Sequence, residues 1–194
     1  MIILRKIDIH EMARRFAIGE VNSEFFFSQD EIFKKKTLQL LTSGDYNLEC
    51  LGIQNHQKTR GSFVDSLPGD TKWFLAKLRM SEDEFEQLRT IKDDGWVKYT
   101  NGSLRLIDAA IFLAANPEAD ARVTRVIGAC KQGSIELCGI TLFGRTANGP
   151  LTIVEGTARL VSLYLTNIKQ QSCPHRLEEI EIALGLSEAN WSFS

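Results

Sequence analysis

The stretch Pro150-Leu-Thr-Ile-Val-Glu-Gly-Thr-Ala-Arg-Leu-Val-Ser-Leu-Tyr-Leu165 decides the fold of this 194-residue chain. Residues 151–154 are a short apolar run that is typical of a buried strand. Glu155 and Gly156 follow, and beyond them apolar side chains recur at helical spacing. These side chains belong to Leu160, Val161, Tyr164, Leu165 and Ile168. The sequence therefore predicts a strand, a glycine turn and a helix that packs one face against a sheet.

Such a turn can bind an anion, because the first backbone N–H groups of a helix have no partner inside the helix and the helix dipole adds positive potential there. Gly156, Thr157, Ala158 and Arg159 would form the turn and the first helical residues. A hydroxyl and a guanidinium beside free N–H groups suit a phosphate, so we expect these four residues to bind the ligand. The alternative is a plain strand-to-helix connection with a solvated arginine.

Glu155 would lie beside this turn. A carboxylate repels a bare phosphate, so its presence favours a bridging Mg²⁺ or a contact to a ribose or substrate hydroxyl. If the site turns a substrate over, Glu155 is the candidate catalytic base or metal ligand, and Arg159 would neutralise charge on the phosphoryl oxygens. The sequence does not decide between binding and turnover.

The segment Ile153-Val-Glu-Gly-Thr-Ala-Arg-Leu-Val-Ser-Leu163 resembles the strand–turn–helix signature of the ParB/sulfiredoxin-like superfamily. The resemblance extends over residues 135–168 and implies that the turn and the arginine hold nucleotide phosphates. In this chain Thr157 and Ala158 fill the positions where that superfamily usually has a histidine. Thr157 also stands where a sulfiredoxin needs its nucleophilic cysteine, so we expect no sulfiredoxin chemistry.

This resemblance leads to a nucleotide- or phosphate-binding domain as the first functional hypothesis, with or without turnover. A non-catalytic protein-interaction module that kept the fold is the alternative. A DNA-associated protein is less favoured, because the chromosome-partitioning relatives carry a helix-turn-helix after the signature. In this chain the residues after Ile168 indicate one strand and an aromatic tail instead.

The amino-acid composition limits which other classes of function are compatible with the chain. The chain has 23 basic and 25 acidic residues, so its net charge of −2 creates no overall field that favours nucleic acid or an anionic membrane. No stretch approaches the roughly 20 apolar residues of a membrane span. The four cysteines and three histidines lack the spacing of a metal site or a disulfide framework. We expect a cytoplasmic α/β (α+β) domain with a mixed sheet over residues 1–194. Its protein partner and its cofactor are unknown, and a nucleotide with Mg²⁺ is the candidate cofactor.

Capping and periodicity predict the elements. Capping boxes at Asp8, Ser28 and Ser81 mark three helix starts. The predicted helices are 9–17, 29–43, 82–91, 106–115 and 119–131. The predicted strands are 2–6, 48–53, 72–79, 96–99, 135–143, 151–155 and 179–184, with 135–143 and 151–154 paired as a hairpin.

Residues 54–71 form the longest polar stretch and are predicted to be a loop. Lys58, Thr59 and Arg60 could reach over a phosphate site as a lid, because loops longer than about 12–15 residues are often functional. The same three residues also fit an exposed surface loop. The sequence favours the surface loop.

Overall fold

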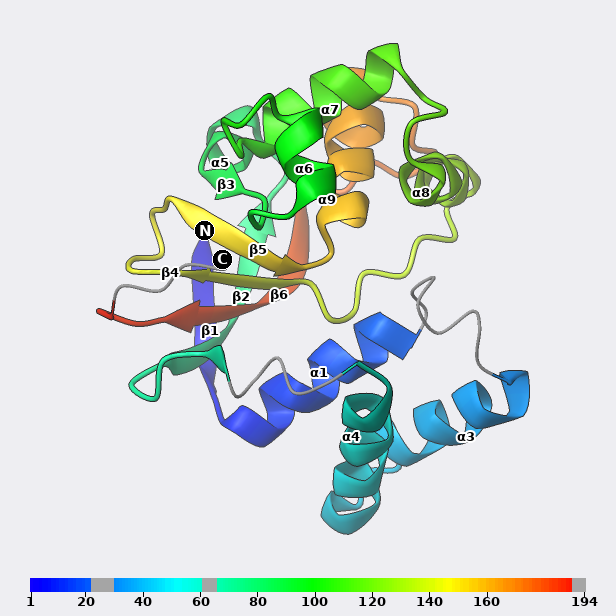
Figure 1. Cartoon of the computed structure of the whole chain (residues 1–194), viewed down its shortest axis with the longest axis vertical. Helices are drawn as coiled ribbons and strands as arrows, with labels where there is room; N and C mark the ends of the chain where they lie inside the picture. Colours follow the sequence, from blue (N-terminus) through cyan, green and yellow to red (C-terminus); the bar gives the residue numbers. More distant parts are fainter. Residues whose placement is uncertain (22–29, 61–65, 190–194) are drawn as a thin grey trace.

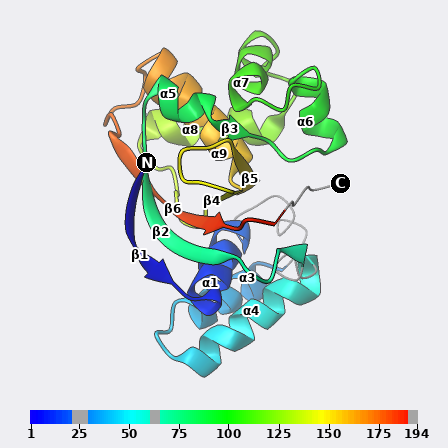
Figure 2. The same ribbon diagram turned by 90° about the vertical axis from the view of Figure 1, so that its left-hand side faces the viewer.

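The computed structural model describes residues 1–21, 30–60 and 66–189, except the side chains of residues 58–60. Within these residues a mixed six-stranded sheet lies between two groups of helices (Figures 1 and 2). The strands are β1 (Ile2–Ile7), β2 (Lys72–Arg79), β3 (Leu88–Arg89), β4 (Thr141–Gly144), β5 (Leu151–Glu155) and β6 (Glu179–Leu186). The chain is thus a single α/β domain with a mixed sheet, as the sequence predicts.

The helices divide between the two faces of this sheet. One face carries α1 (Ile9–Val21), with α3 (Glu31–Leu41) and α4 (Tyr46–Arg60) outside it (Figure 1). The other face carries α5 (Glu82–Glu86), α6 (Asp94–Tyr99), α7 (Leu106–Ala115), α8 (Ala121–Gln132) and α9 (Thr157–Leu163), and α9 continues into the π-helix η2 (Tyr164–Lys169). Among the described residues, none of these helices has the length and apolarity needed to cross a membrane.

The strand order is β1-β2-β6-β4-β5-β3. β2 pairs antiparallel with β1 and with β6, β4 pairs parallel with β6, and β5 pairs antiparallel with β4 and parallel with β3. The predicted β4–β5 hairpin is therefore confirmed. It brings the end of β5 to Thr141, the first residue of β4, which lies opposite Glu155.

Successive residues of a strand point to opposite sides of the sheet, so each face of the sheet has its own hydrophobic core. Trp73 and Leu75 of β2 pack with Phe143 and with Met12 and Phe16 of α1. On the other face a larger core forms between the sheet and α7 and α9. It includes Leu78, Leu142, Ile153, Ile182, Leu184, Leu113, Leu160 and Val161.

The strand–glycine–helix connection is confirmed in full. β5 ends at Glu155, Gly156 adopts a left-handed conformation with φ of 96°, and α9 begins at Thr157. A Cβ at position 156 would lie 2.9 Å from Cγ1 of Ile140. Gly156 is thus required both by its positive φ and by a close neighbour.

The predicted strand 135–143 is too long, since β4 contains only Thr141–Gly144. The preceding residues leave the sheet to contact α1. Gly139 has a φ of +84°, and a Cβ there would lie 2.5 Å from the Arg15 carbonyl oxygen and 2.7 Å from the Gly19 Cα. This backbone-to-backbone contact places Cys138 and Gly139 against the last turn of α1.

Two predicted strands are wrong because local caps start helices there. The segment 48–53 belongs to α4, whose start is capped by Asp45: its carboxylate accepts from the N–H groups of Asn47 (2.9 Å) and Leu48 (3.0 Å). The segment 96–99 belongs to α6, where Asp93 accepts from the Trp96 N–H at 2.8 Å. An aspartate at this position satisfies a free N–H of the first turn.

Other boundaries also differ from the prediction. The helix predicted at 82–91 stops at Glu86, because the chain then enters β3. α3 begins after Asp30, whereas Ser28 lies outside the described residues. Residues 54–60 of the predicted loop are helical in α4, so Lys58, Thr59 and Arg60 lie in its last turn rather than in a lid; residues 61–65 lie outside the described part.

The two sides of α7 provide a test of the core. Leu113 is 3 % exposed and Ile111 is 61 % exposed on the same helix. We expect Leu113→Ala to lower the free energy of unfolding by about 2–5 kcal/mol through loss of buried contacts and the remaining cavity. Ile111→Ala should change it by no more than about 0.5 kcal/mol. Urea denaturation measures both, and equal effects would contradict this assignment of the core.

Candidate functional site

A cleft of about 440 Å³ opens at the C-terminal end of β5, between α1 on one side and α6 and α8 on the other. We call it the β5 cleft. Its wall includes all five residues that the sequence singles out: Glu155, Gly156, Thr157, Ala158 and Arg159. Its volume lies in the range of small-molecule sites, about 300–1,000 Å³. The structure therefore gathers the predicted site residues around a space that a ligand can enter.

The start of α9 forms one wall of the cleft. The first bond of the helical ladder runs from the Leu160 N–H to the Gly156 carbonyl oxygen at 2.9 Å. The N–H groups of Thr157, Ala158 and Arg159 lie ahead of that bond, at the positive end of the helix dipole. Thr157 is 9 % exposed and borders the cleft. The geometry expected for an anion at this turn is present.

Arg159 is not a solvated surface residue. Its side chain is 13 % exposed, and Nη2 donates to Oε1 of Glu155 at 2.9 Å. Nη1 donates to the carbonyl oxygens of Cys138 and, at 3.4 Å, Glu136. The guanidinium therefore joins α9, the end of β5 and the segment before β4, while it still borders the cleft.

Glu155 occupies a water-poor position at the cleft wall, where its side chain is 17 % exposed. Burial and, after it, the neighbouring Glu20 carboxyl raise the pKa of this carboxyl to about 8, although Arg159 offsets part of their effect. A carboxyl with this pKa is mostly protonated at pH 7. Glu155 then carries no charge that repels a phosphate, and it offers a proton rather than accepting one.

Sequence reasoning missed Glu20. This residue is 2 % exposed in the last turn of α1, and its carboxyl is close enough to Glu155 to raise the pKa of that residue. Its spacing in the sequence could have revealed it, because Glu20 follows Phe16 by one helical turn and Met12 by two, and Met12 and Phe16 are buried. An acid on the apolar face of a helix marks a buried polar contact. The predicted helix ended at residue 17, so the signal was not used.

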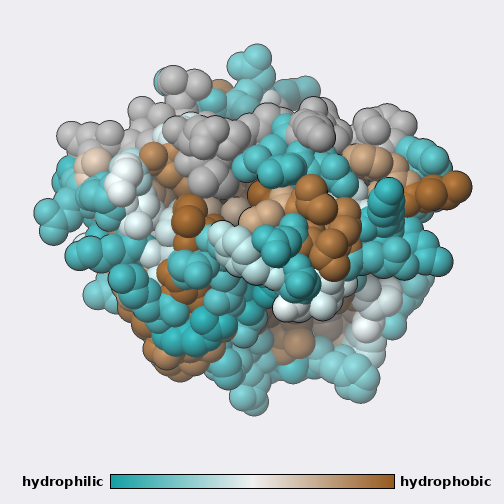
Figure 3. Space-filling model, turned by 90° about the horizontal axis from the view of Figure 1, so that it is seen from below, coloured by the Kyte–Doolittle hydropathy of each residue, from teal (hydrophilic) through white to brown (hydrophobic). Residues whose placement is uncertain are grey.

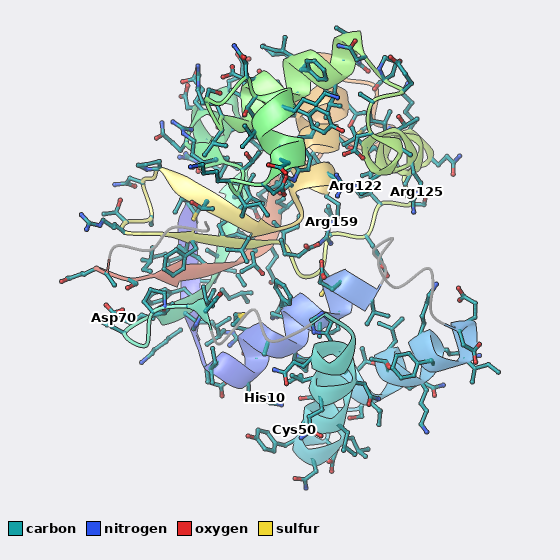
Figure 4. All side chains as sticks on the ribbon, in the orientation of Figure 1. His10, Cys50, Asp70, Arg122, Arg125 and Arg159 are labelled. Carbon is teal, nitrogen blue, oxygen red and sulfur yellow. The ribbon has the colours of Figure 1, made fainter. Side chains whose placement is uncertain are left out.

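Two arginines of α8 were also missed. Arg122 and Arg125 stand one turn apart on this helix and border the cleft. Arg122 donates to Asp120, Nε at 3.0 Å and Nη2 at 2.5 Å, and lies over the Trp96 ring at 5.5 Å from its centroid. With Arg159 they surround one space from two helices (Figure 4). Their i, i+3 spacing on a predicted helix was the available signal.

The described residues hold no group of three or more histidine, cysteine, aspartate or glutamate side chains arranged for a metal ion. No protein-family model, curated protein or solved structure matches the chain. The ParB/sulfiredoxin-like resemblance of residues 153–163 stays a prediction.

The carboxyl of Glu155 should make stability depend on pH. Its pKa is about 8 in the folded protein and about 4.3 in an unfolded chain, so between these values the folded state binds more protons. The free energy of unfolding should therefore fall as pH rises through this window, by up to about 1.4 kcal/mol per pH unit from this group. Glu155→Gln should remove this contribution. Urea denaturation from pH 5 to 8 measures it.

The exposed Glu118 supplies the matched control, because Glu118→Gln removes a carboxyl that lies away from the cleft. Its pH profile should follow that of the unchanged protein. If Glu155→Gln and Glu118→Gln have the same profile, the carboxyl of Glu155 has an ordinary pKa.

Arg159→Ala should destabilise the fold. It leaves the Glu155 carboxyl and the Cys138 carbonyl without the guanidinium donor, and a hydrogen bond involving a charged group contributes about 1.5–3 kcal/mol. We expect a loss in this range by urea denaturation at pH 7. Arg176→Ala removes an exposed arginine and is the control, with an expected change of at most about 0.5 kcal/mol. Equal effects would mean that Arg159 is not a structural tie.

Proposed function

We propose that the β5 cleft binds a nucleotide or another phosphate-bearing ligand, with a phosphate at the N-terminus of α9. One observation carries this proposal: the cleft that contains the glycine turn is also bordered by three arginines, Arg122, Arg125 and Arg159. Backbone N–H groups and guanidinium groups are the donors that proteins direct at phosphate oxygens. The resemblance of residues 153–163 to the ParB/sulfiredoxin-like signature supports the same position for the phosphate.

The charge state of Glu155 supports an anion as well. A protonated Glu155 does not repel a phosphate, so the ligand needs no Mg²⁺ to offset this residue. A magnesium ion that used Glu155 as a ligand would first have to displace its proton. Mg²⁺ should therefore matter more at high pH than at neutral pH.

If the bound ligand is turned over, Glu155 is placed to act as a general acid. Its raised pKa keeps the proton available near neutral pH, which is the condition for efficient proton donation. Arg159, hydrogen-bonded to Glu155, would stabilise negative charge that develops on a phosphoryl oxygen. This assignment replaces the role of base that the sequence suggests for Glu155.

A second candidate function is a protein-interaction module. β1 is an edge strand, and its residues Ile2, Ile3 and Leu4 are 48 %, 46 % and 45 % exposed. On α4, Leu48 and Leu51 are 41 % and 49 % exposed, and the face seen from below shows apolar side chains among polar ones (Figure 3). Exposed apolar edge strands are common sites of strand pairing with a partner. This function would use surfaces away from the cleft.

A thermal-shift screen with ATP and with inorganic pyrophosphate, each with and without Mg²⁺, tests the first function. A ligand that binds only the folded state stabilises it by about 2.7 kcal/mol at 100 times its Kd, so the melting temperature should rise. Arg125→Ala should weaken the binding that is found by roughly 10- to 150-fold, because it removes a charged donor from the cleft wall.

Lys131→Ala is the matched control for that variant. Lys131 lies on the same helix and is exposed, and its removal changes the net charge equally. It should leave the affinity unchanged within about twofold, since exposed charges at a distance are screened by salt. The proposal fails if no phosphate compound raises the melting temperature, or if both variants weaken binding equally.

A further inference from the structure

The two edges of the sheet differ in length and in what covers them. β3, at one edge, has two residues, and Arg89 forms a bridge with Arg105 on its outer side. β1, at the other edge, has six residues, and within the described part of the chain no strand pairs with its outer side (Figure 2). An uncovered edge offers backbone N–H and C=O groups to a further strand. The sheet is therefore open to extension at β1 rather than at β3.

The first half of β1 is apolar on both faces of the sheet. Ile2 and Ile3 point to opposite faces, yet they are 48 % and 46 % exposed, and Leu4 is 45 % exposed. Neither layer of helices therefore covers this end of the edge fully. Because removal of apolar surface from water is favourable, the segment favours a partner that covers both faces, as a second sheet with its own helices does.

Opposite charges lie at the two ends of β1. Arg5 and Lys6 are at the end that leads into α1. At the other end, Met1 forms an ion pair with Glu84 in the first turn of α5, and Asp83 belongs to the same turn. Lys6 and Asp83 are both exposed, and no ion pair within the described residues includes either of them. One basic and one acidic side chain are thus available at opposite ends of the same edge.

We propose that β1 pairs antiparallel with β1 of a second copy of this chain, about a two-fold axis at Ile3, so that the sheet continues through both copies. The inference rests on the protein-interaction function proposed above and names its partner. Antiparallel pairing places Ile3 opposite Ile3 of the second copy and Lys6 beside the acidic turn of the second copy, and the two-fold axis repeats both contacts. Parallel pairing would instead place Arg5 and Lys6 beside the same cations of the second copy, which is unfavourable.

Two further features of β1 restrict the pairing to one arrangement. The register with β2 shifts between Ile3 and Arg5, which leaves Leu4 as a bulge, and two cations follow it. Bulges and basic side chains discourage pairing along an edge. Because these features begin at Leu4, they leave the first residues of β1 for the contact and disfavour registers that bring the cations together. A contact between identical surfaces then closes a dimer, since the short and covered β3 cannot extend the sheet further.

Sedimentation equilibrium over a micromolar range of concentrations tests the partner, and the unchanged protein should show a monomer–dimer equilibrium. Ile3→Lys and Ile3→Glu should each weaken the dimer by at least about 100-fold, because like charges then face each other at the two-fold axis. An equimolar mixture of the two variants should associate again, because opposite charges then meet. Ile111→Lys is the control, since Ile111 is 61 % exposed on α7, and it should dimerise as the unchanged protein does.

The charged ends of β1 test the orientation of the two strands. Lys6→Glu should weaken the dimer by roughly tenfold, because two exposed ion pairs are each replaced by a pair of like charges. Asp83→Lys in the same chain should restore the affinity. Lys35→Glu makes the same change of charge at an exposed position of α3 and should leave the dimer unchanged.

The other outcomes each overturn the proposal. A monomer at every concentration would exclude a second copy as the partner. A dimer that persists in both Ile3 variants would use another surface, which leaves the interaction function standing without β1. Variants that separate but do not associate when mixed would exclude the two-fold arrangement at Ile3.

Circular dichroism shows whether each variant is folded. If Ile3→Lys does not fold, the comparison of Lys6→Glu with the double variant Lys6→Glu, Asp83→Lys decides in its place, and no recovery in the double variant would overturn the pairing. No residue of β1 borders the β5 cleft, so the ATP screen decides the proposed phosphate site independently of the dimer.

Discussion

The Arg159 guanidinium makes the interaction on which the site depends. With donors to Glu155 and to the carbonyl oxygens of Cys138 and Glu136, it ties the start of α9 to the end of β5 and to the segment before β4, which is 21 to 23 residues away in the chain. A backbone contact completes this joint, because a Cβ at Gly19 would lie 2.9 Å from the Cys138 carbonyl oxygen and 3.1 Å from Nη2 of Arg159. Only a residue without a side chain lets α1 approach so closely. The contact fixes one wall of the β5 cleft.

That close approach also explains the electrostatics of the site. Because α1 packs tightly at Gly19, the next residue, Glu20, is carried into the interior beside Glu155. Two acids then lie in a place with little water, and Arg159 donates to one of them. The raised pKa of Glu155 is the result, since burial disfavours its charged form and a neighbouring carboxyl adds to the effect. A tightly packed backbone thus brings a second acid beside Glu155 and raises the pKa of Glu155.

The sequence predicted correctly those helices and strands whose conformation depends mainly on residues close together in the chain. Strand 72–79, helix 106–115, strand 151–155 and the glycine turn after it match the structure, because periodicity and a positive-φ glycine act over a few residues. The segments 48–53 and 96–99 were wrong, since short apolar runs fit a strand or a helix and the caps at Asp45 and Asp93 were not recognised. The strand 135–143 was too long because the backbone at Cys138 and Gly139 packs on α1, a contact that no local pattern contains.

The sequence by itself determined the mixed α/β fold class and the cluster Glu155, Gly156, Thr157, Ala158 and Arg159 at one strand–turn–helix, because these five residues are adjacent in the chain and their geometry is local. Only the tertiary structure decided that Glu20 comes from α1 and Arg122 and Arg125 come from α8 to the same cleft. It also decided that Arg159 is tied to Glu155 rather than solvated, and that Glu155 holds its proton near neutral pH. The physical reason is that burial and long-range charge pairing depend on which segments pack together. The amino-acid sequence does not state which residues that are distant in the chain become neighbours.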